Sequence, residues 1–486
     1  MSETSDKTGA WAGGMDPAEF RRAMHQAADM VVDYLERAAD YPVVPRVAPG
    51  DVRRQLPASG PMQPESINAI LADFTRLIEP NVTHWNHPGF LAYFANTGSG
   101  PGIIGETLAA ALNNNAMLWK TGPAATELEE QVCDWLRQWM QLPAEFKGHI
   151  NDTASISSLM ALAAARQRLR EFDIRQLGMA GRPELPTITV YASEHAHSSI
   201  DKAILLLGLG VSNLRKIGAD DSFRMRPEEL EKVIAADIAR GCKPMAVVAT
   251  VGTTSSTSID PVPEIAAICR KYGVWLHVDA AYAGAAAICP ELRATMPGIE
   301  AADSLVINPH KWLFVPMDCS VLFVRDVALL KEAFSLVAHY LTTAESSAAT
   351  NLMDLGIPLG RRFRSLKLWM VFRAFGLERL QAAIRGHCAL AREFAAWVAK
   401  EPGFEVVAPV PFSTVCFRAT PAGTPQEQDA FNERLEARVN AAGPVFISHT
   451  QLRGRYVLRL AVGNLQTQRE HLETAWRLIR EAAGRS

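Results

Sequence analysis

A series of short, unbroken apolar runs between residues 187 and 324 constrains the fold of this chain more than any other feature. Strands that read as continuous apolar runs are typical of a parallel sheet buried on both faces. Helical patterns, such as those over 226–240 and 261–272, separate the runs. We therefore predict an α/β core with a mainly parallel sheet between helices. The runs cover 187–191, 245–251, 274–278, 304–307 and 319–324.

The two ends of the chain follow different patterns. An amphipathic helix is predicted over 17–37, where Asp16 and Pro17 form a helix start, and a second helix over 65–78 follows a proline-rich path. This part lacks a core of its own, so we expect an arm that packs on a second subunit. The C-terminal part combines helices with strand-like pieces at 413–418 and 456–461, which predicts a smaller α+β domain.

Composition excludes several classes of protein. The 486 residues carry 49 basic and 52 acidic side chains, a net charge of −3, so no nucleic acid or anionic membrane is expected as a partner. No run of about 20 apolar residues could span a bilayer, and residues 1–14 do not read as a signal peptide. Seven widely spaced cysteines without a Cys-x-x-Cys pair predict reduced core thiols, a cytoplasmic location and no metal site.

Reactive side chains follow the predicted strands. His197, Thr254, Asp279 and Lys311 each come shortly after a strand, and the carboxyl ends of such strands share the ligand-binding edge of the sheet. A lysine, an acid and an imidazole suit pyridoxal phosphate, whose aldehyde bonds to a lysine and whose ring nitrogen faces an acid. Taken singly, each has a plainer explanation: a surface lysine, a turn-capping carboxylate or a loop histidine.

The turn 153–155, before an apolar helix, also allows two interpretations. It could simply cap that helix, or its free amides could hold a phosphate group, and both can be true together.

Taken together and in order, these motifs resemble those of the group II pyridoxal-phosphate-dependent decarboxylases, and most closely the aromatic-L-amino-acid decarboxylases. The resemblance covers nearly the whole chain. It rests on Thr83-His84-Trp85, Pro88 with Phe90, Ala92-Tyr93-Phe94, Thr126-Glu127-Leu128-Glu129, Ala196-His197-Ser198-Ser199, Gly252-Thr253-Thr254, His277-Val278-Asp279-Ala280-Ala281-Tyr282-Ala283-Gly284, Asn308-Pro309-His310-Lys311-Trp312 and Pro358-Leu359-Gly360-Arg361-Arg362-Phe363-Arg364-Ser365-Leu366-Lys367.

The resemblance implies a fold type I α/β enzyme that forms a homodimer with its sites at the subunit interface. It implies a mainly parallel seven-stranded sheet in a large domain that binds pyridoxal 5'-phosphate. The expected division is an N-terminal helical arm at 1–99, the large domain at 100–367 and a small C-terminal α+β domain at 368–486.

The resemblance also assigns roles to single residues. Lys311 is expected to bond to the cofactor, Asp279 to pair with its ring nitrogen, His197 to stack on its ring, and Tyr340 to return a proton after CO2 leaves. Other expected cofactor contacts are Ala154, Ser155, Thr254, Ala281, Asn308 and His310. Expected substrate contacts are Trp85, Tyr93, Phe94, Asn96 and Gly360.

The implied reaction is decarboxylation of an aromatic L-amino acid to an amine. Tryptophan, 5-hydroxytryptophan, DOPA, tyrosine and phenylalanine stay open, although Gly360 matches a position where some indole-preferring plant members carry glycine. The alternatives are an aromatic acetaldehyde synthase, in which Tyr340 or His197 would typically be replaced, and a decarboxylase of a non-aromatic amino acid. More distant rivals are a cysteine desulfurase, an aminotransferase that uses Arg459 to bind a carboxylate, and a non-catalytic protein of the same fold.

Overall fold

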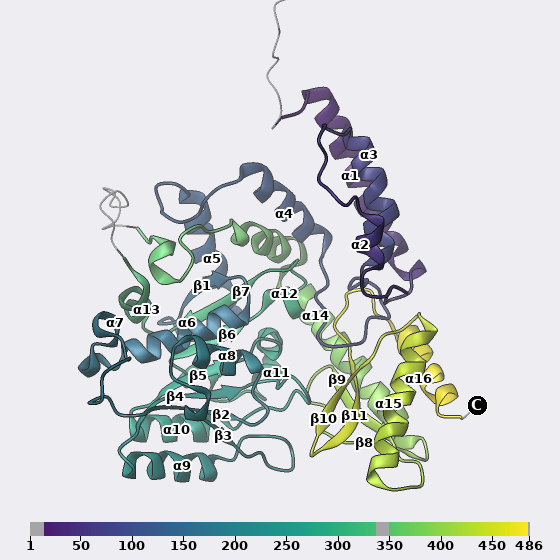
Figure 1. The fold of residues 1–486 in the computed structure, drawn as a ribbon. Helices are drawn as coiled ribbons and strands as arrows, with labels where there is room; N and C mark the ends of the chain where they lie inside the picture. The colour runs from purple at the N-terminus through teal and green to yellow at the C-terminus, as the bar shows by residue number, and fades with distance from the viewer. Residues whose placement is uncertain (1–13, 337–348, 485–486) are drawn as a thin grey trace, which may run out of the picture.

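The computed structural model describes residues 14–336 and 349–484. Figure 1 shows a large body that contains the main sheet, a smaller body at the C-terminal end of the chain, and a helical arm that projects away from both. The described helices contain none long and apolar enough to cross a membrane.

The described part of the large body is built on a seven-stranded sheet in the order β1-β7-β6-β5-β4-β2-β3. All neighbouring pairs are parallel except those of β7, which runs antiparallel to β1 and β6. The prediction of a mainly parallel seven-stranded sheet is therefore confirmed. The strands are β1 (Lys147–Asn151), β2 (Ile188–Ser193), β3 (Leu214–Ile217), β4 (Lys243–Thr250), β5 (Trp275–Asp279), β6 (Ser304–Ile307) and β7 (Ser320–Val324).

Two apolar cores, one on each face, explain the unbroken apolar runs. In β4, Val247 packs in one core and Val248 in the other, because successive side chains of a strand point to opposite faces. Helices α6 (Ala154–Gln167), α8 (Ser198–Leu206) and α13 (Val327–Phe334) cover one face, and α5 (Pro123–Trp139), α9 (Pro227–Ala239), α10 (Val262–Tyr272) and part of α14 (Arg364–Lys400) cover the other. Shorter helices are α7 (Ile174–Leu177), α11 (Pro290–Arg293) and α12 (Pro309–Trp312).

The smaller body has a four-stranded antiparallel sheet, in the order β10-β11-β9-β8. Its described elements are β8 (Phe404–Val406), β9 (Thr414–Ala419), α15 (Pro425–Ala442), β10 (Ser448–Leu452), β11 (Arg455–Ala461) and α16 (Arg469–Ala482). Helix α14 joins it to the large body and bends at Gly376, whose φ of 64° is not helical. The predicted boundary at 367/368 falls inside α14, and the division into three domains stays a prediction.

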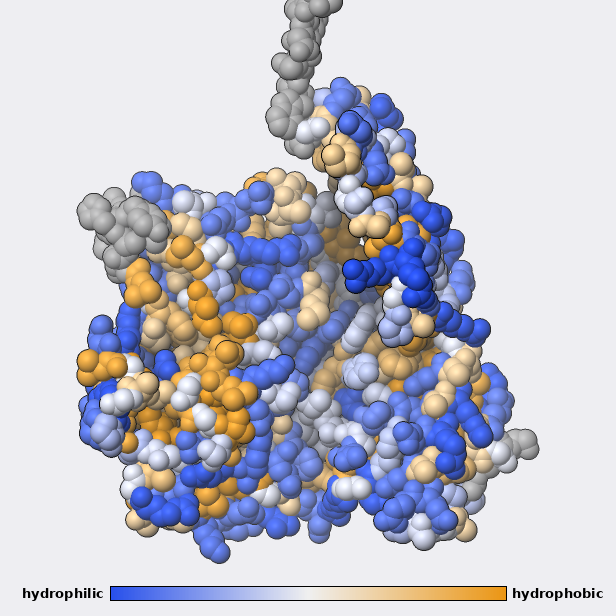
Figure 2. Space-filling view, in the orientation of Figure 1, coloured by the Kyte–Doolittle hydropathy of each residue, from blue (hydrophilic) through white to orange (hydrophobic). Residues whose placement is uncertain are grey.

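The arm leaves apolar side chains exposed. Helix α1 (Pro17–Arg37) has the bounds predicted from the sequence, with Asp16 as its cap, and α2 (Asp51–Gln55) and α3 (Ile67–Asp73) follow it. A π-helical turn at 74–78 extends α3. Hydrophobic side chains lie between hydrophilic ones along this arm in Figure 2. The arm's exposed apolar residues, each at least 39% exposed, include Phe20, Met24, Val31, Ile70 and Phe74.

A second exposed apolar stripe lies on α4 (Gly100–Leu112), where Ile104, Leu108 and Leu112 are 57%, 45% and 64% exposed. Their spacing of four residues places them on one face of the helix. All seven cysteines lie in the described residues and are free.

Candidate active site

Lys311 lies on the one-turn helix α12, directly after β6. Its backbone N–H donates to the carbonyl of Asn308 at 2.9 Å, which holds the turn closed. The Nζ atom lies 5.4 Å from the centre of the Phe94 ring. Burial lowers the pKa of the Lys311 amine, Asp279 acts in the opposite direction, and Arg459 lowers the pKa further. A buried lysine with a lowered pKa is a stronger nucleophile at neutral pH because more of it is uncharged.

Asp279 is the last residue of β5, and its side chain is buried. One carboxylate oxygen accepts the N–H of Ala281 at 3.1 Å. Its negative charge raises the pKa of both Lys311 and His197, so the three groups share one electrostatic environment. The structure thus places the predicted acid, amine and imidazole at one edge of the sheet.

His197 caps α8. Its Nδ1 atom accepts the N–H of Ser199 at 3.1 Å and lies 2.9 Å from the Ser199 hydroxyl. Burial lowers the pKa of His197, while Asp279 raises it and Lys311 lowers it. Because Nδ1 accepts a hydrogen bond, the neutral ring carries its proton on Nε2. This capping role was not part of the sequence prediction.

Two of the residues expected to hold the phosphate form the start of α6, and the third, Asn308, directly follows β6. The cap residue Thr153 makes no side-chain hydrogen bond to the first turn, which begins with Ala154 and Ser155. The buried side-chain oxygen of Asn308 has no hydrogen-bond partner among the described residues. An uncapped helix start is a ready site for an anion, so these residues fit the phosphate of pyridoxal phosphate.

The other expected cofactor contacts differ in burial. Ala281 is buried, whereas Thr254 is exposed on the turn that follows β4. His310 is buried, and its Nδ1 accepts the N–H of Cys319 at 2.9 Å. Burial lowers the pKa of His310 to about 3, so the ring is neutral. Its hydrogen bond to Cys319 fixes the residue that precedes β7.

Phe94 joins the expected substrate side to Lys311. Its ring stacks on that of Tyr282, with the ring centres 3.8 Å apart. The Tyr282 ring stacks in turn on Trp312, the residue after Lys311, with the ring centres 4.6 Å apart. Trp85 stacks on Phe90 at 4.3 Å and lies 6.2 Å from Tyr93, which is 53% exposed.

The remaining expected residues are less closely tied to Lys311. The Asn96 amide lies 3.8 Å from the sulfur of Met317. Gly360 is exposed and lines a small cavity with Asn151 and Asp152, just before the start of α6. Among the described residues, Gly360 makes no contact with Lys311. Tyr340 lies outside the described residues.

Arg459 of β11 is a site residue that the sequence analysis considered only for a rival class. It is buried, its Nε donates to the carbonyl of Ser255 at 3.0 Å, and its Nη1 donates to the carbonyl of Tyr93. Its guanidinium lies 4.5 Å from the Phe94 ring centre, and Nη2 has no partner among the described residues. A cation inside the apolar run 457–461 was the available signal in the sequence, because a buried charge needs a partner.

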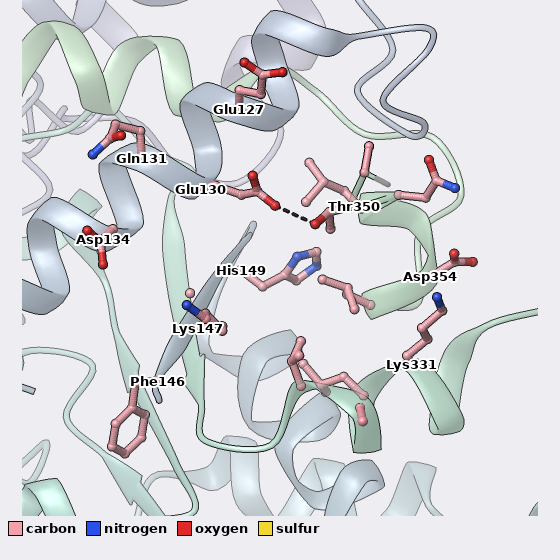
Figure 3. A pocket seen from close by; sticks show the side chains of 18 residues that line it. Glu127, Glu130, Gln131, Asp134, Phe146, Lys147, His149, Lys331, Thr350 and Asp354 are labelled. Atoms are coloured by element: carbon pink, nitrogen blue, oxygen red, sulfur yellow. Dashed lines mark hydrogen bonds between the residues drawn. The ribbon is translucent and has the colours of Figure 1, made fainter. Parts of the chain in front are cut away.

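A cavity of about 880 Å³ lies elsewhere, between α5, β1 and α13 (Figure 3). Its described lining holds none of the predicted site residues. Glu130 accepts a hydrogen bond from Thr350 across it at 2.5 Å, and the buried His149 ring lies in its wall. The size of this cavity therefore does not identify the predicted active site.

Comparison with known proteins agrees with this geometry. The family model described as "Pyridoxal-dependent decarboxylase conserved domain" matches residues 49–420. Tyrosine decarboxylase 2 of Arabidopsis thaliana is 43% identical over 97% of this chain and 88% of its own length. Phenylacetaldehyde synthase of Arabidopsis thaliana is 40% identical over 96% of both.

The solved structure of Oryza sativa TDC with PLP and tryptamine superimposes with a TM-score of 0.92 at 37% identity, covering 97% of this chain and 99% of that one. The matched family model spans most of the chain, and the relatives span nearly all of it. The chain is a member of the pyridoxal-dependent decarboxylase family.

Proposed function

We propose that this protein decarboxylates an aromatic L-amino acid to the corresponding amine and CO2, with pyridoxal 5'-phosphate as cofactor. The observation that carries the proposal is the amine of Lys311, which has a lowered pKa, shares an environment with Asp279 and His197, and lies 5.4 Å from the Phe94 ring. A tyrosine decarboxylase at 43% identity and a tryptophan decarboxylase at 40% identity support the substrate class.

The chain offers a partner for each part of the cofactor. The uncapped start of α6 and the Asn308 side chain would hold the phosphate, Asp279 the ring nitrogen and Lys311 the aldehyde, with Ala281 and His197 on the two faces of the ring. When bound, pyridoxal phosphate accepts the electron pair that departing CO2 leaves behind.

The remaining chemistry belongs to side chains. Lys311 supplies an amine whose lowered pKa favours the uncharged form, and the Asp279 carboxylate would face a protonated ring nitrogen. The open Nη2 of Arg459, beside Phe94, would attract and orient the substrate carboxylate by a charge-assisted hydrogen bond. Tyr340, outside the described residues, is the proposed donor of the proton that completes the amine.

Amine is the proposed product, and aldehyde is the alternative. The presence of His197 and Tyr340 favours the amine, whereas the similarity to a phenylacetaldehyde synthase keeps the alternative open. Product analysis by mass spectrometry, over tryptophan, 5-hydroxytryptophan, DOPA, tyrosine and phenylalanine, decides between them and ranks the substrates. Aldehyde with ammonia in place of amine would contradict the proposal.

Replacing Lys311 tests the attachment. Lys311→Ala is expected to lower kcat by about 1,000-fold or more, because the reacting amine is gone. Borohydride reduction followed by peptide mass spectrometry should place the pyridoxyl group on the Lys311 peptide of the unmodified protein. The control is Lys271→Ala, an exposed lysine paired with Glu231, which should leave both results unchanged. A pyridoxyl group on another lysine would refute the assignment.

We further infer a homodimer in the cytoplasm. The exposed apolar stripe of α4 and the apolar side chains of the arm support a second copy as the partner, and seven free cysteines suit a reducing compartment. Changing Ile104 and Leu112 together to Glu should convert dimer to monomer in light scattering. The matched control is Leu206→Glu, a 73% exposed residue of α8, which should stay dimeric. A double variant that keeps the mass of the unmodified protein would contradict the dimer through α4.

A further inference from the structure

A buried histidine that the proposed chemistry does not use contacts Trp312, the residue that follows the reactive lysine in the sequence. His387 is on α14 and is 5% exposed. Its Nδ1 accepts the indole N–H of Trp312 at 2.9 Å, and the two rings are nearly coplanar, 7° apart. Trp312 directly follows Lys311 on α12, so His387 fixes the side chain of the residue adjacent in sequence to the reactive lysine.

The other side of the His387 ring faces the C-terminal body. The backbone of Asn464 forms a hydrogen bond with the ring, and burial nevertheless lowers the pKa of His387 to about 4. The ring is therefore neutral at pH 7. With Nδ1 accepting from Trp312, the proton is on Nε2, where it can donate to the Asn464 carbonyl. If Nδ1 were protonated, its N–H would face the indole N–H of Trp312, and no hydrogen bond could form between two donors.

Asn464 continues the path to the expected substrate side. Its buried side-chain amide donates to the carbonyls of His87 at 3.0 Å and Trp85 at 3.3 Å, and its oxygen accepts the N–H of Gln466 at 2.8 Å. Every hydrogen-bonding atom of this carboxamide is thus used between two segments far apart in the sequence.

This polar path and the aromatic stack both begin at Trp312. The stack runs from Trp312 through Tyr282 to Phe94, and the path runs from Trp312 through His387 and Asn464 to the backbone of 85–87, the segment that leads to Phe94. Both therefore connect Trp312 to the segment from Trp85 to Phe94.

We propose that His387 is a positioning residue for the reaction at Lys311: it ties Trp312 to Asn464 and so fixes the amine relative to the segment from Trp85 to Phe94. The inference rests on the proposed role of Lys311. His387 itself touches neither Lys311 nor Phe94 in the recorded contacts of the described residues, so its effect passes through its two hydrogen-bond partners.

Four variants of the holoenzyme separate the two links. His387→Asn keeps an acceptor at the Nδ1 position for Trp312, His387→Gln keeps a donor at the Nε2 position for Asn464, and His387→Leu keeps neither. Trp312→Phe removes the indole donor and keeps an aromatic ring. His449→Asn, at a histidine 53% exposed on β10, is the control.

The expected results differ by link. Loss of the Trp312 link, in His387→Gln, His387→Leu and Trp312→Phe, should lower kcat about tenfold and move the pH midpoint of the visible absorbance of bound pyridoxal phosphate, because the amine is misplaced. Loss of the Asn464 link, in His387→Asn and His387→Leu, should raise KM about three- to tenfold and speed hydrogen exchange in peptides covering 85–94. The control should match the unmodified protein.

The proposal is overturned if the single-link variants His387→Asn and His387→Gln behave alike, or if they lower only the unfolding temperature. These two variants decide the matter even if His387→Leu does not fold. Failure of the proposed function looks different, since borohydride would then leave no pyridoxyl group on the Lys311 peptide. If that peptide carries the pyridoxyl group while the His387 variants are silent, only the present inference fails.

Discussion

At the scale of single residues, the buried Arg459 both holds neighbouring backbone in place and keeps one nitrogen that could bind a ligand. Two of its nitrogens donate to backbone carbonyls, which fixes the guanidinium against Phe94, and the third has no partner among the described residues. Burial lowers the pKa of Arg459, yet an arginine stays protonated at any pH of interest.

Substitution of Arg459 should therefore separate binding from chemistry. Arg459→Met removes the charge-assisted partner of a substrate carboxylate, so KM should rise about 10- to 100-fold. Arg459→Lys keeps the positive charge but lacks the planar guanidinium, so its KM should lie between that of Arg459→Met and that of the unmodified protein. Steady-state kinetics with one amino acid and with its decarboxylated amine as inhibitor measures this. An amine inhibition constant that weakens as much as KM would argue against the carboxylate.

The residues that the sequence could and could not predict differ in how they reach the site. Lys311, Asp279 and His197 each follow a strand of the sheet, so topology alone brings them to one edge. Arg459, His387 and Asn464 arrive from the small body and from α14, and their positions depend on how the two bodies pack. A single sequence without that packing carries no signal that joins them.

At the scale of elements, β1 is held by a buried ion pair. Glu129 of α5 accepts two hydrogen bonds from Arg361, at 2.7 and 2.9 Å, and the N–H of Ile150 in β1 at 2.9 Å. Arg361 also donates to the Ile150 carbonyl and to His149. These contacts lock the 358–361 segment against the strand that leads to the start of α6.

Removing one partner of this pair should be costly. Glu129→Ala leaves Arg361 buried without its counter-charge, so the free energy of unfolding should fall by about 3–5 kcal/mol. Urea denaturation measures it, with Glu145→Ala as the control, since Glu145 is exposed in the turn before β1 and should change stability by less than about 0.5 kcal/mol. Equal losses in the two variants would mean that the buried pair is not a stabilising contact.

Elements were predictable where the apolar pattern is strong. The strands β2 and β4 to β7 and the helices α1, α9 and α10 lie within a few residues of their predicted positions. The strand β1 was missed because its sequence, Lys-Gly-His-Ile-Asn, is mostly polar and buries only its later residues. The edge strand β3, with Arg215 and Lys216, and the polar strand β10 were missed for the same reason.

At the scale of the whole molecule, buried neutral histidines make stability depend on pH. Burial lowers the pKa of His277 and His387 to about 4 and that of His310 to about 3. Above pH 6.5 these rings are neutral in both the folded and the unfolded chain. As the pH falls below 6.5, the unfolded chain takes up protons that the folded chain refuses, so stability is lost between pH 6.5 and 4. Asp260, with its pKa raised to about 6, acts in the opposite direction.

The contribution of one ring can be isolated. Each proton should add about 1.4 kcal/mol per pH unit to the slope of the unfolding free energy against pH. His277→Gln should therefore reduce that slope by about this amount between pH 4.5 and 6, measured by denaturant unfolding. An unchanged slope would show that His277 titrates alike in the folded and unfolded chain.

The position of Arg459 and Asn464 in the chain has a practical consequence. Both come after residue 420, where the match to the family model ends. A fragment trimmed to the matched residues would keep the Lys311 amine, which is proposed to bond the cofactor, and would lose the Arg459 guanidinium and the Asn464 carboxamide. The end of the family match at residue 420 therefore does not coincide with the end of the residues that form the proposed site.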